Sequence, residues 1–315
     1  MVGGTASRTW PAPRGPEAHA VDVTESLHAL RSAPSGPTGP GTACPTHAAH
    51  GVYGRGVSEL ADQIIVSLRQ HHAQLAEVIE GLDDEQLVAP SGASEWRICD
   101  VLSHLGSGSE IMLRPIAAAA AGTEVPEGEN HAIWDRWNAM APREQAQGYV
   151  DHGAVLVETL ESLTPEQRDA VTIRRPRLPE PVPLEVAAGM RLNEVAQHTW
   201  DVTVGLDPAA TVDAIAAGLM LTLLSDQLSF MLGFTAEPDA LSEPTEVAAG
   251  DWALVVDQSA RIVPAGTNPL ATFTGTTESF YRLLGGRLAE RYTPAGTEVT
   301  GSVTLDDLRR VFPGF

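Results

Sequence analysis

The most informative stretch of this chain reads RLNEVAQHTWD from Arg191 to Asp201. If it forms a helix, Glu194 and His198 stand one turn apart on the same face, with Cβ atoms about 6 Å apart. A carboxylate oxygen and an imidazole nitrogen placed in this way can hold one divalent cation, as ligand pairs one helical turn apart do in zinc enzymes. The same spacing also occurs on solvated helix faces with a single intrahelical hydrogen bond, so the spacing alone leaves both interpretations open.

Two ligands do not hold a metal tightly, and His104 is the best candidate for a third. It lies in the segment WRICDVLSHL, Trp96–Leu105, on a second run of apolar residues with helical period. That run is far enough back in the chain to belong to a different helix. Three protein ligands with an open fourth position describe a catalytic zinc site, not a structural one. The candidate ligands of such a site are therefore His104, Glu194 and His198.

The two segments together resemble a known family. A Trp-x-x-x-Asp-Val-Leu-x-His-Leu pattern from Trp96, followed much later by Glu-Val-x-x-His-x-Trp-Asp-Val from Glu194, is similar to the DinB-type metal-binding proteins. More narrowly, it resembles the mycothiol-dependent maleylpyruvate isomerase family, over about residues 52–315. Further matching segments in the C-terminal part are Thr274-Gly275, Leu283-Leu284-Gly285-Gly286-Arg287, Val299-Thr300-Gly301 and Phe312-Pro313-Gly314. In that family the residues matching His104, Glu194 and His198 bind zinc.

The resemblance implies a fold and a chemistry. The implied fold is α plus α+β: a DinB-like antiparallel four-helix bundle at 52–208, followed by a smaller α+β domain at 209–315. The implied activity uses zinc to bind mycothiol as a zinc thiolate, which adds to an electrophilic substrate and leads either to cis–trans isomerisation of maleylpyruvate or to S-transfer. A non-catalytic alternative, a small-molecule sensor or partner-binding module on the same bundle, stays open.

Arginine suits an enzyme that must bind carboxylates, because its planar guanidinium matches their geometry. We expect Arg287, in the Gly-Gly-Arg turn, to be a catalytic residue, with Arg191 as a second candidate and Arg282 as a weaker one. For each of them a plain ion pair in an acidic protein is an equally good interpretation. Asp201 follows His198 by three positions and is expected either to orient that ligand or to pair locally.

Composition narrows the possible partners. The net charge is −21, and nucleic-acid binders need cationic side chains to replace phosphate counterions, so we expect no nucleic-acid partner and no anionic membrane surface. The two cysteines, Cys44 and Cys99, predict no structural disulfide, which fits a reducing cytoplasm. We expect a cytoplasmic protein that acts on a small molecule as a monomer or weak homodimer. Trp96 and Trp200 are expected in the core.

Pro- and Gly-rich stretches and the periodicity of apolar residues indicate how the chain is divided into segments. Residues 1–51 are rich in Pro, Gly, Ala, Ser and Thr and are predicted to form a disordered extension. The periodicity and the Pro and Gly breakers then predict helices over about 60–81, 98–121, 130–163 with a break at Pro142, 184–204, 211–232, 279–288 and 305–311, strands at 252–256, 271–274 and 298–300, and a loop or edge ribbon at 164–183.

Deleting residues 1–51 is expected to leave the melting temperature and the zinc content unchanged, because a segment of this composition buries little apolar surface. Thermal melting and metal analysis of the full and shortened chains, side by side, check this. A fall of several degrees on deletion would show that the segment packs against the rest of the protein.

Overall fold

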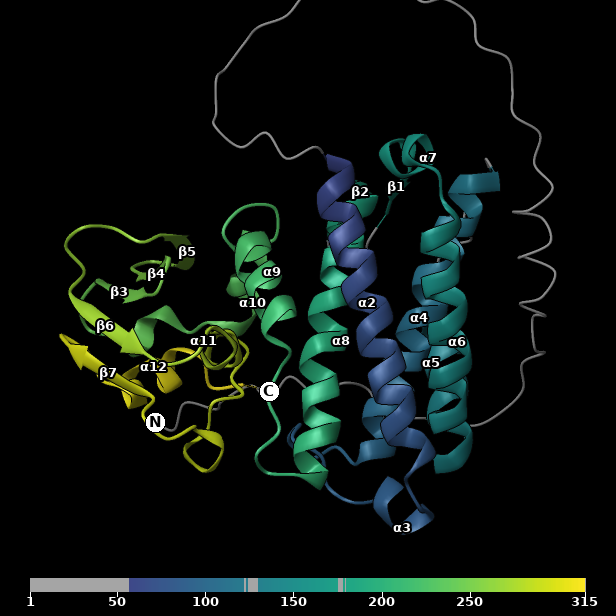
Figure 1. Cartoon of the computed structure of the whole chain (residues 1–315), viewed down its shortest axis with the longest axis horizontal. Helices are drawn as coiled ribbons and strands as arrows, with labels where there is room; N and C mark the ends of the chain where they lie inside the picture. The colour runs from purple at the N-terminus through teal and green to yellow at the C-terminus, as the bar shows by residue number, and fades with distance from the viewer. Residues whose placement is uncertain (1–56, 122, 124–129, 175–177, 179, 315) are drawn as a thin grey trace, which may run out of the picture.

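Four long helices lie side by side and make up most of the helical part of the protein (Figure 1). The computed structural model describes residues 57–121, 123, 130–174, 178 and 180–314, so the predicted extension at 1–51 lies outside it. The four helices are α2 (Val57–Glu80), α4 (Ile98–Ala121), α6 (Pro142–Ser162) and α8 (Leu184–Leu206). Helix α2 packs on α8 and α6, and α4 packs on α6 and α8. Shorter elements complete this part: α3 (Asp84–Leu87), α5 (Asn130–Asn138), α7 (Pro165–Ala170), β1 (Thr172–Ile173) and β2 (Val182–Pro183).

The helix boundaries follow local chemistry that the sequence displays. Pro142 occupies the first turn of α6, where its missing N–H costs nothing, and the predicted helix over 130–163 is therefore divided there into α5 and α6. Helix α7 was not predicted inside the loop at 164–183. It forms because the Thr164 side chain accepts a hydrogen bond from the Gln167 N–H while Pro165 opens the first turn. The expected ribbon is present as the β1–β2 pair.

The rest of the chain forms an α+β part, as predicted. It contains a five-stranded mixed sheet with the order β5-β4-β3-β6-β7, in which only the β3–β6 pairing is parallel. The strands are β3 (Thr245–Ala249), β4 (Trp252–Val256), β5 (Ala260–Pro264), β6 (Ala271–Thr274) and β7 (Glu298–Gly301). The helices are α9 (Ala214–Leu224), η1 (Ser229–Met231), α10 (Leu232–Thr235), η2 (Pro238–Ala240), α11 (Thr277–Leu284), η3 (Glu290–Tyr292) and α12 (Leu305–Val311).

Three details of this part differ from the prediction. Strands β3 and β5 were missed, and the helix expected over 211–232 ends at Leu224. The helix expected to reach residue 288 ends at Leu284, because Gly285 caps it and Gly286 turns the chain with a φ of +69°. Because the helix ends at Leu284, the chain turns there and Arg287 reaches Asp201 of α8.

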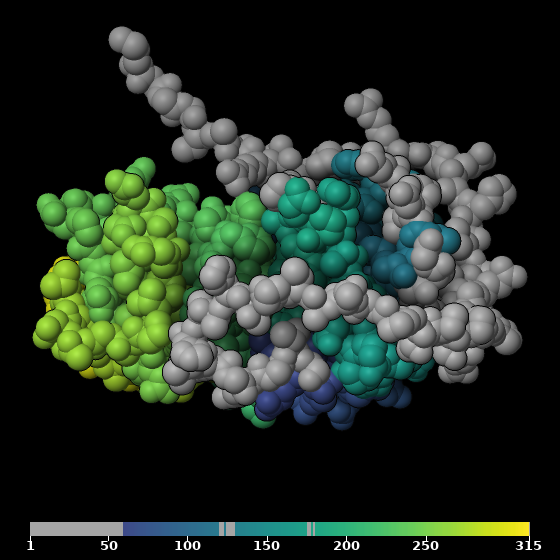
Figure 2. All heavy atoms as spheres, turned by 90° about the horizontal axis from the view of Figure 1, so that it is seen from above, coloured from purple at the N-terminus to yellow at the C-terminus, as the bar shows by residue number. Residues whose placement is uncertain are grey.

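The two parts meet along α8. Helix α9 packs on both α8 and α11, and the view from above shows the green and yellow α+β part beside the teal helices (Figure 2). Trp200 of α8 is buried at this junction, as predicted, with its indole against the Tyr292 ring and the Arg282 guanidinium. Helix α8 thus contacts both α4 and the α+β part.

Among the described helices, none has by itself both the length and the apolar character of a membrane span. Only α9 taken together with Ser229–Thr235 meets that test, and this pair is bent by 93°.

A tryptophan fixes the distance between α4 and α6. The Trp137 indole of α5 is fully buried, and its Nε1 donates to Glu110 at 2.8 Å. A Cβ placed on Gly106 of α4 would lie 2.2 Å from the indole, and one placed on Gly148 of α6 would lie 2.7 Å from it. Only glycine leaves room for the ring at these two positions.

Gly106→Ala is expected to destabilise the protein by about 1–3 kcal/mol, because the added methyl group overlaps the fully buried Trp137 ring. Gly218→Ala on α9 is the matched control, since nothing lies within 4 Å of its added Cβ. The control should be neutral or stabilising by up to about 1 kcal/mol, through the helix propensity of alanine. Urea unfolding of both variants compares the two, and equal effects would contradict the packing argument.

Candidate metal centre

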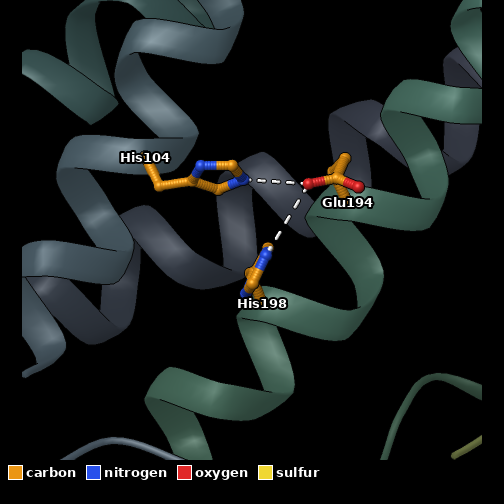
Figure 3. Close-up of side chains that lie close together, drawn as sticks. All are labelled: His104, Glu194 and His198. Atoms are coloured by element: carbon orange, nitrogen blue, oxygen red, sulfur yellow. Dashed lines mark hydrogen bonds and ion pairs between the residues drawn. The ribbon is translucent and has the colours of Figure 1, made fainter. Parts of the chain in front are cut away.

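Three predicted ligands converge in one cluster between α4 and α8 (Figure 3). His104 projects from α4, and Glu194 and His198 project from successive turns of α8. The Glu194 Oε2 atom lies 2.9 Å from His104 Nε2 and 3.7 Å from His198 Nε2. One ligand atom from each residue lies within 4.8 Å of the other two. The structure therefore brings together the three side chains that the two sequence segments predicted.

The donor set and its spacing fit a zinc ion. Two imidazole nitrogens and one carboxylate oxygen are typical ligands of catalytic zinc. Ligands at the usual 2.0–2.1 Å in tetrahedral geometry stand roughly 3.3 Å from one another. The two distances to Glu194 Oε2 bracket that value, so small side-chain movements suffice to receive the ion. The His104 and Glu194 side chains are 30% and 39% exposed, which leaves the cluster accessible from solvent.

The orientation of His198 is set by Asp201. Its Nδ1 lies 2.7 Å from Asp201 Oδ2, and a carboxylate can only accept, so Nδ1 carries the proton. The other ring nitrogen, Nε2, is then the one directed toward Glu194. This arrangement of carboxylate, histidine and metal position recurs in zinc sites, where it fixes the ring and raises its basicity. Of the two interpretations of Asp201, the contact matches the orienting one.

The electrostatics favour an ionised Glu194 and a neutral His198. Burial would raise the pKa of Glu194, but the hydrogen bond from His104 and the nearby charges of His104, His198 and Arg191 outweigh it and lower that pKa strongly. Burial lowers the pKa of His198, against the opposing hydrogen bond to Asp201. An ionised carboxylate and a neutral imidazole are the states required of zinc ligands.

Arg287 reaches this cluster from the α+β part. Its Nε and Nη2 donate to the two oxygens of Asp201 at 2.9 and 2.7 Å, and its Nη1 donates to Gln197 Oε1 and to the Gly285 carbonyl. Burial would raise the pKa of Asp201, but the Arg287 charge dominates and lowers it. The sequence did not predict this pairing, which links the two parts of the protein through a residue that holds His198.

The other two candidate arginines, Arg191 and Arg282, are both buried. Arg191 donates from Nη2 to the Leu105 carbonyl at 2.6 Å and to Ser109 Oγ at 2.7 Å, so it ties α8 to α4. Arg282 is paired with Glu278 inside the α+β part and lies over the Trp200 ring. These contacts give Arg282 a structural role.

Trp96 is partly buried against the core, as predicted, and its ring also borders the ligand cluster, which the sequence did not predict. Its half-buried ring lies 5.3 Å from the His104 ring and 5.8 Å from the His198 ring, between centroids. The available signal was its position eight residues before His104, on the N-terminal side of α4. That spacing does not reveal contact, because the loop before α4 must fold back to make it.

A cation held by this donor set retains net positive charge, because only one of the three ligands is anionic. It would therefore stabilise an anionic fourth ligand, such as hydroxide or a thiolate.

Comparison with known proteins agrees with this geometry. Residues 68–203 match the model of the mycothiol maleylpyruvate isomerase N-terminal domain, a segment that includes all three candidate ligands. Two solved structures share the fold: a mycothiol-dependent maleylpyruvate isomerase at 14% identity and a mutant of such an isomerase at 13%. Each has a TM-score of 0.55 and covers 77% of this chain and 94% of its own. None of the curated proteins matches the chain in sequence. The predicted family resemblance is confirmed, while the structural likeness at this identity establishes the fold alone.

His198→Ala and His104→Ala are each expected to lose most of the bound zinc while the protein stays folded, because an open three-ligand site is not usually the main source of folding energy. Zinc content of the purified variants by elemental analysis, with circular dichroism as the folding check, measures this. His131→Ala, at an exposed position on α5, is the matched control and should retain zinc. Full zinc occupancy in the His104→Ala, His198→Ala double variant would rule out the site.

Proposed function

We propose that this chain, whose residues 68–203 carry the match to the mycothiol maleylpyruvate isomerase N-terminal domain, is a zinc- and mycothiol-dependent enzyme of that isomerase family. It would activate a low-molecular-weight thiol for addition to an electrophilic substrate, with cis–trans isomerisation as the outcome. The single observation that carries the proposal is the convergence of His104, Glu194 and His198 at a solvent-accessible position.

The residues around the cluster support that chemistry. His104, Glu194 and His198 would hold the zinc, and Asp201 would keep His198 in the binding orientation. Zinc bound there would supply the positive charge that keeps a thiol deprotonated and nucleophilic at neutral pH. This donor set leaves a position for an external ligand, which separates an enzyme site from a purely structural one.

Arg287 and Arg191 remain our candidates for catalytic residues. Addition of a thiolate to a conjugated keto acid places negative charge on the keto oxygen, and a nearby cation stabilises it. Arg287 interacts electrostatically with both Glu194 and His198, and Arg191 does so with Glu194, so both charges are felt at the cluster. Arg287 would act there while it remains paired with Asp201.

We also propose the domain boundaries, the partners, the location and the oligomeric state of the protein. We assign residues 52–208 to a DinB-like antiparallel four-helix bundle domain and residues 209–315 to an α+β domain. The partners would be a small electrophilic molecule and mycothiol, with no nucleic acid and no membrane. We further propose a cytoplasmic location and a monomer or weak homodimer.

The proposal predicts turnover that requires both zinc and mycothiol. The zinc-loaded full chain should isomerise maleylpyruvate in the presence of mycothiol, as followed by its absorbance, and should lose activity when a chelator removes the metal. Glu194→Gln keeps the side-chain shape but removes the anionic ligand, and it should lower the rate by at least about 100-fold.

Three outcomes separate this function from its alternatives. Conjugation of mycothiol to an electrophile such as monobromobimane, without isomerisation, would identify S-transfer at the same site. Tight binding of mycothiol without any turnover would identify a sensor. Isomerisation that is insensitive to both the chelator and Glu194→Gln would contradict the zinc-dependent proposal.

A further inference from the structure

The loop before α4 is fastened to α8 at the metal cluster. The Gly92 N–H donates to the Asp201 carbonyl at 2.7 Å, so the residue that orients His198 through its side chain also holds this loop through its backbone. A Cβ on Gly92 would lie 2.5 Å from Val204 Cγ1, and only glycine allows the loop to come so close to α8. The loop also closes on itself, since the Ser91 N–H donates to the Trp96 carbonyl at 3.0 Å.

The backbone at Glu95 is in a conformation that side chains rarely adopt. Its φ of +65° is the only positive value at a non-glycine position among the residues that the structure describes. This left-handed conformation costs about 1–2 kcal/mol for an ordinary residue. Such strain persists where the surroundings impose it, and it is concentrated at functional sites. Here it occurs at the residue immediately before Trp96, inside the fastened loop.

The strained turn delivers the Trp96 ring to both histidine ligands. The indole stacks on His198 with an interplanar angle of 17° and is tilted by 54° to His104. The two imidazoles are themselves in edge contact, with centroids 4.8 Å apart. Three rings therefore surround one side of the ligand cluster, and the largest and only apolar one among them is half-exposed.

We propose that Trp96 forms one wall of the external-ligand position and makes that position selective for a thiolate over water and small hydrophilic anions. A sulfur atom gains a favourable contact at about 5 Å from an aromatic ring. Water and hydroxide lose hydrogen-bonding partners against the same apolar face. This role rests on the proposed thiol-dependent function and adds a specificity-determining residue to it.

Titrations of mycothiol and of azide into the cobalt-substituted full chain test the proposal. Mycothiol is titrated into wild type, Trp96→Phe and Trp96→Ala, and binding is read from the sulfur-to-cobalt charge-transfer absorption. Sulfur–aromatic contacts predict that Trp96→Ala weakens mycothiol binding by about tenfold, while Trp96→Phe stays within about twofold of wild type. Azide, a small anion bound at the same position, should bind Trp96→Ala as tightly as wild type or more tightly.

Two controls distinguish a role of Trp96 in ligand selectivity from a purely structural role. Cobalt content should be equal in all three proteins. Trp134→Ala, which removes a half-buried indole in edge contact with His131 instead, should bind mycothiol normally. Wild-type mycothiol affinity in cobalt-loaded Trp96→Ala would overturn the inference while leaving the proposed function intact. Loss of cobalt from both Trp96 variants would also overturn it, because the ring would then serve the metal ligands alone. Wild-type protein that binds cobalt but no mycothiol would refute the proposed function itself.

Discussion

A single buried carboxylate, that of Asp201, connects the metal cluster to the rest of the molecule. It is fully buried, and a charge in that environment is strongly destabilising unless it is paired and hydrogen-bonded. Arg287 supplies the opposite charge through two hydrogen bonds, and His198 supplies a third donor. The Asp201 carbonyl, in turn, holds the loop that carries Trp96. One residue thus orients His198, pairs with an arginine of the α+β part and holds the loop that carries Trp96.

The position of Arg287 depends on close backbone approach. A Cβ on Gly286 would lie 2.2 Å from the Gly314 Cα, and a Cβ on Gly285 would lie 2.3 Å from Gln197 Oε1. The two glycines therefore let the turn before Arg287 sit between α8 and the last described residues of the chain. Tyr281 adds a further link, donating to Asn193 Oδ1 at 2.9 Å. Because Asn193, Gln197 and Asp201 are spaced by four, they form one polar stripe along α8 that faces the α+β part.

The sequence predicted that His104, Glu194 and His198 come together because their signals are local or belong to a recognisable pair of segments. Glu194 and His198 are one turn apart, and the limits of α4 are marked by Arg97–Asp100 pairing at its start and by Gly122 beyond its end. Strand β3 was not predicted because its five residues contain two alanines and no alternating pattern strong enough to mark a strand. The sequence also did not predict the contacts of Arg287 and Trp96. The first joins residues 86 positions apart, and the second depends on an unusual φ at Glu95.

We propose a three-ligand zinc site whose remaining position accepts a thiol sulfur. Zinc X-ray absorption spectroscopy of the purified protein, with and without mycothiol, tests it most directly. We expect only nitrogen and oxygen ligands at about 2.0–2.2 Å in the protein alone, and one added sulfur at about 2.3 Å with mycothiol. An absence of sulfur at saturating mycothiol, or a sulfur ligand already present without it, would contradict this zinc site.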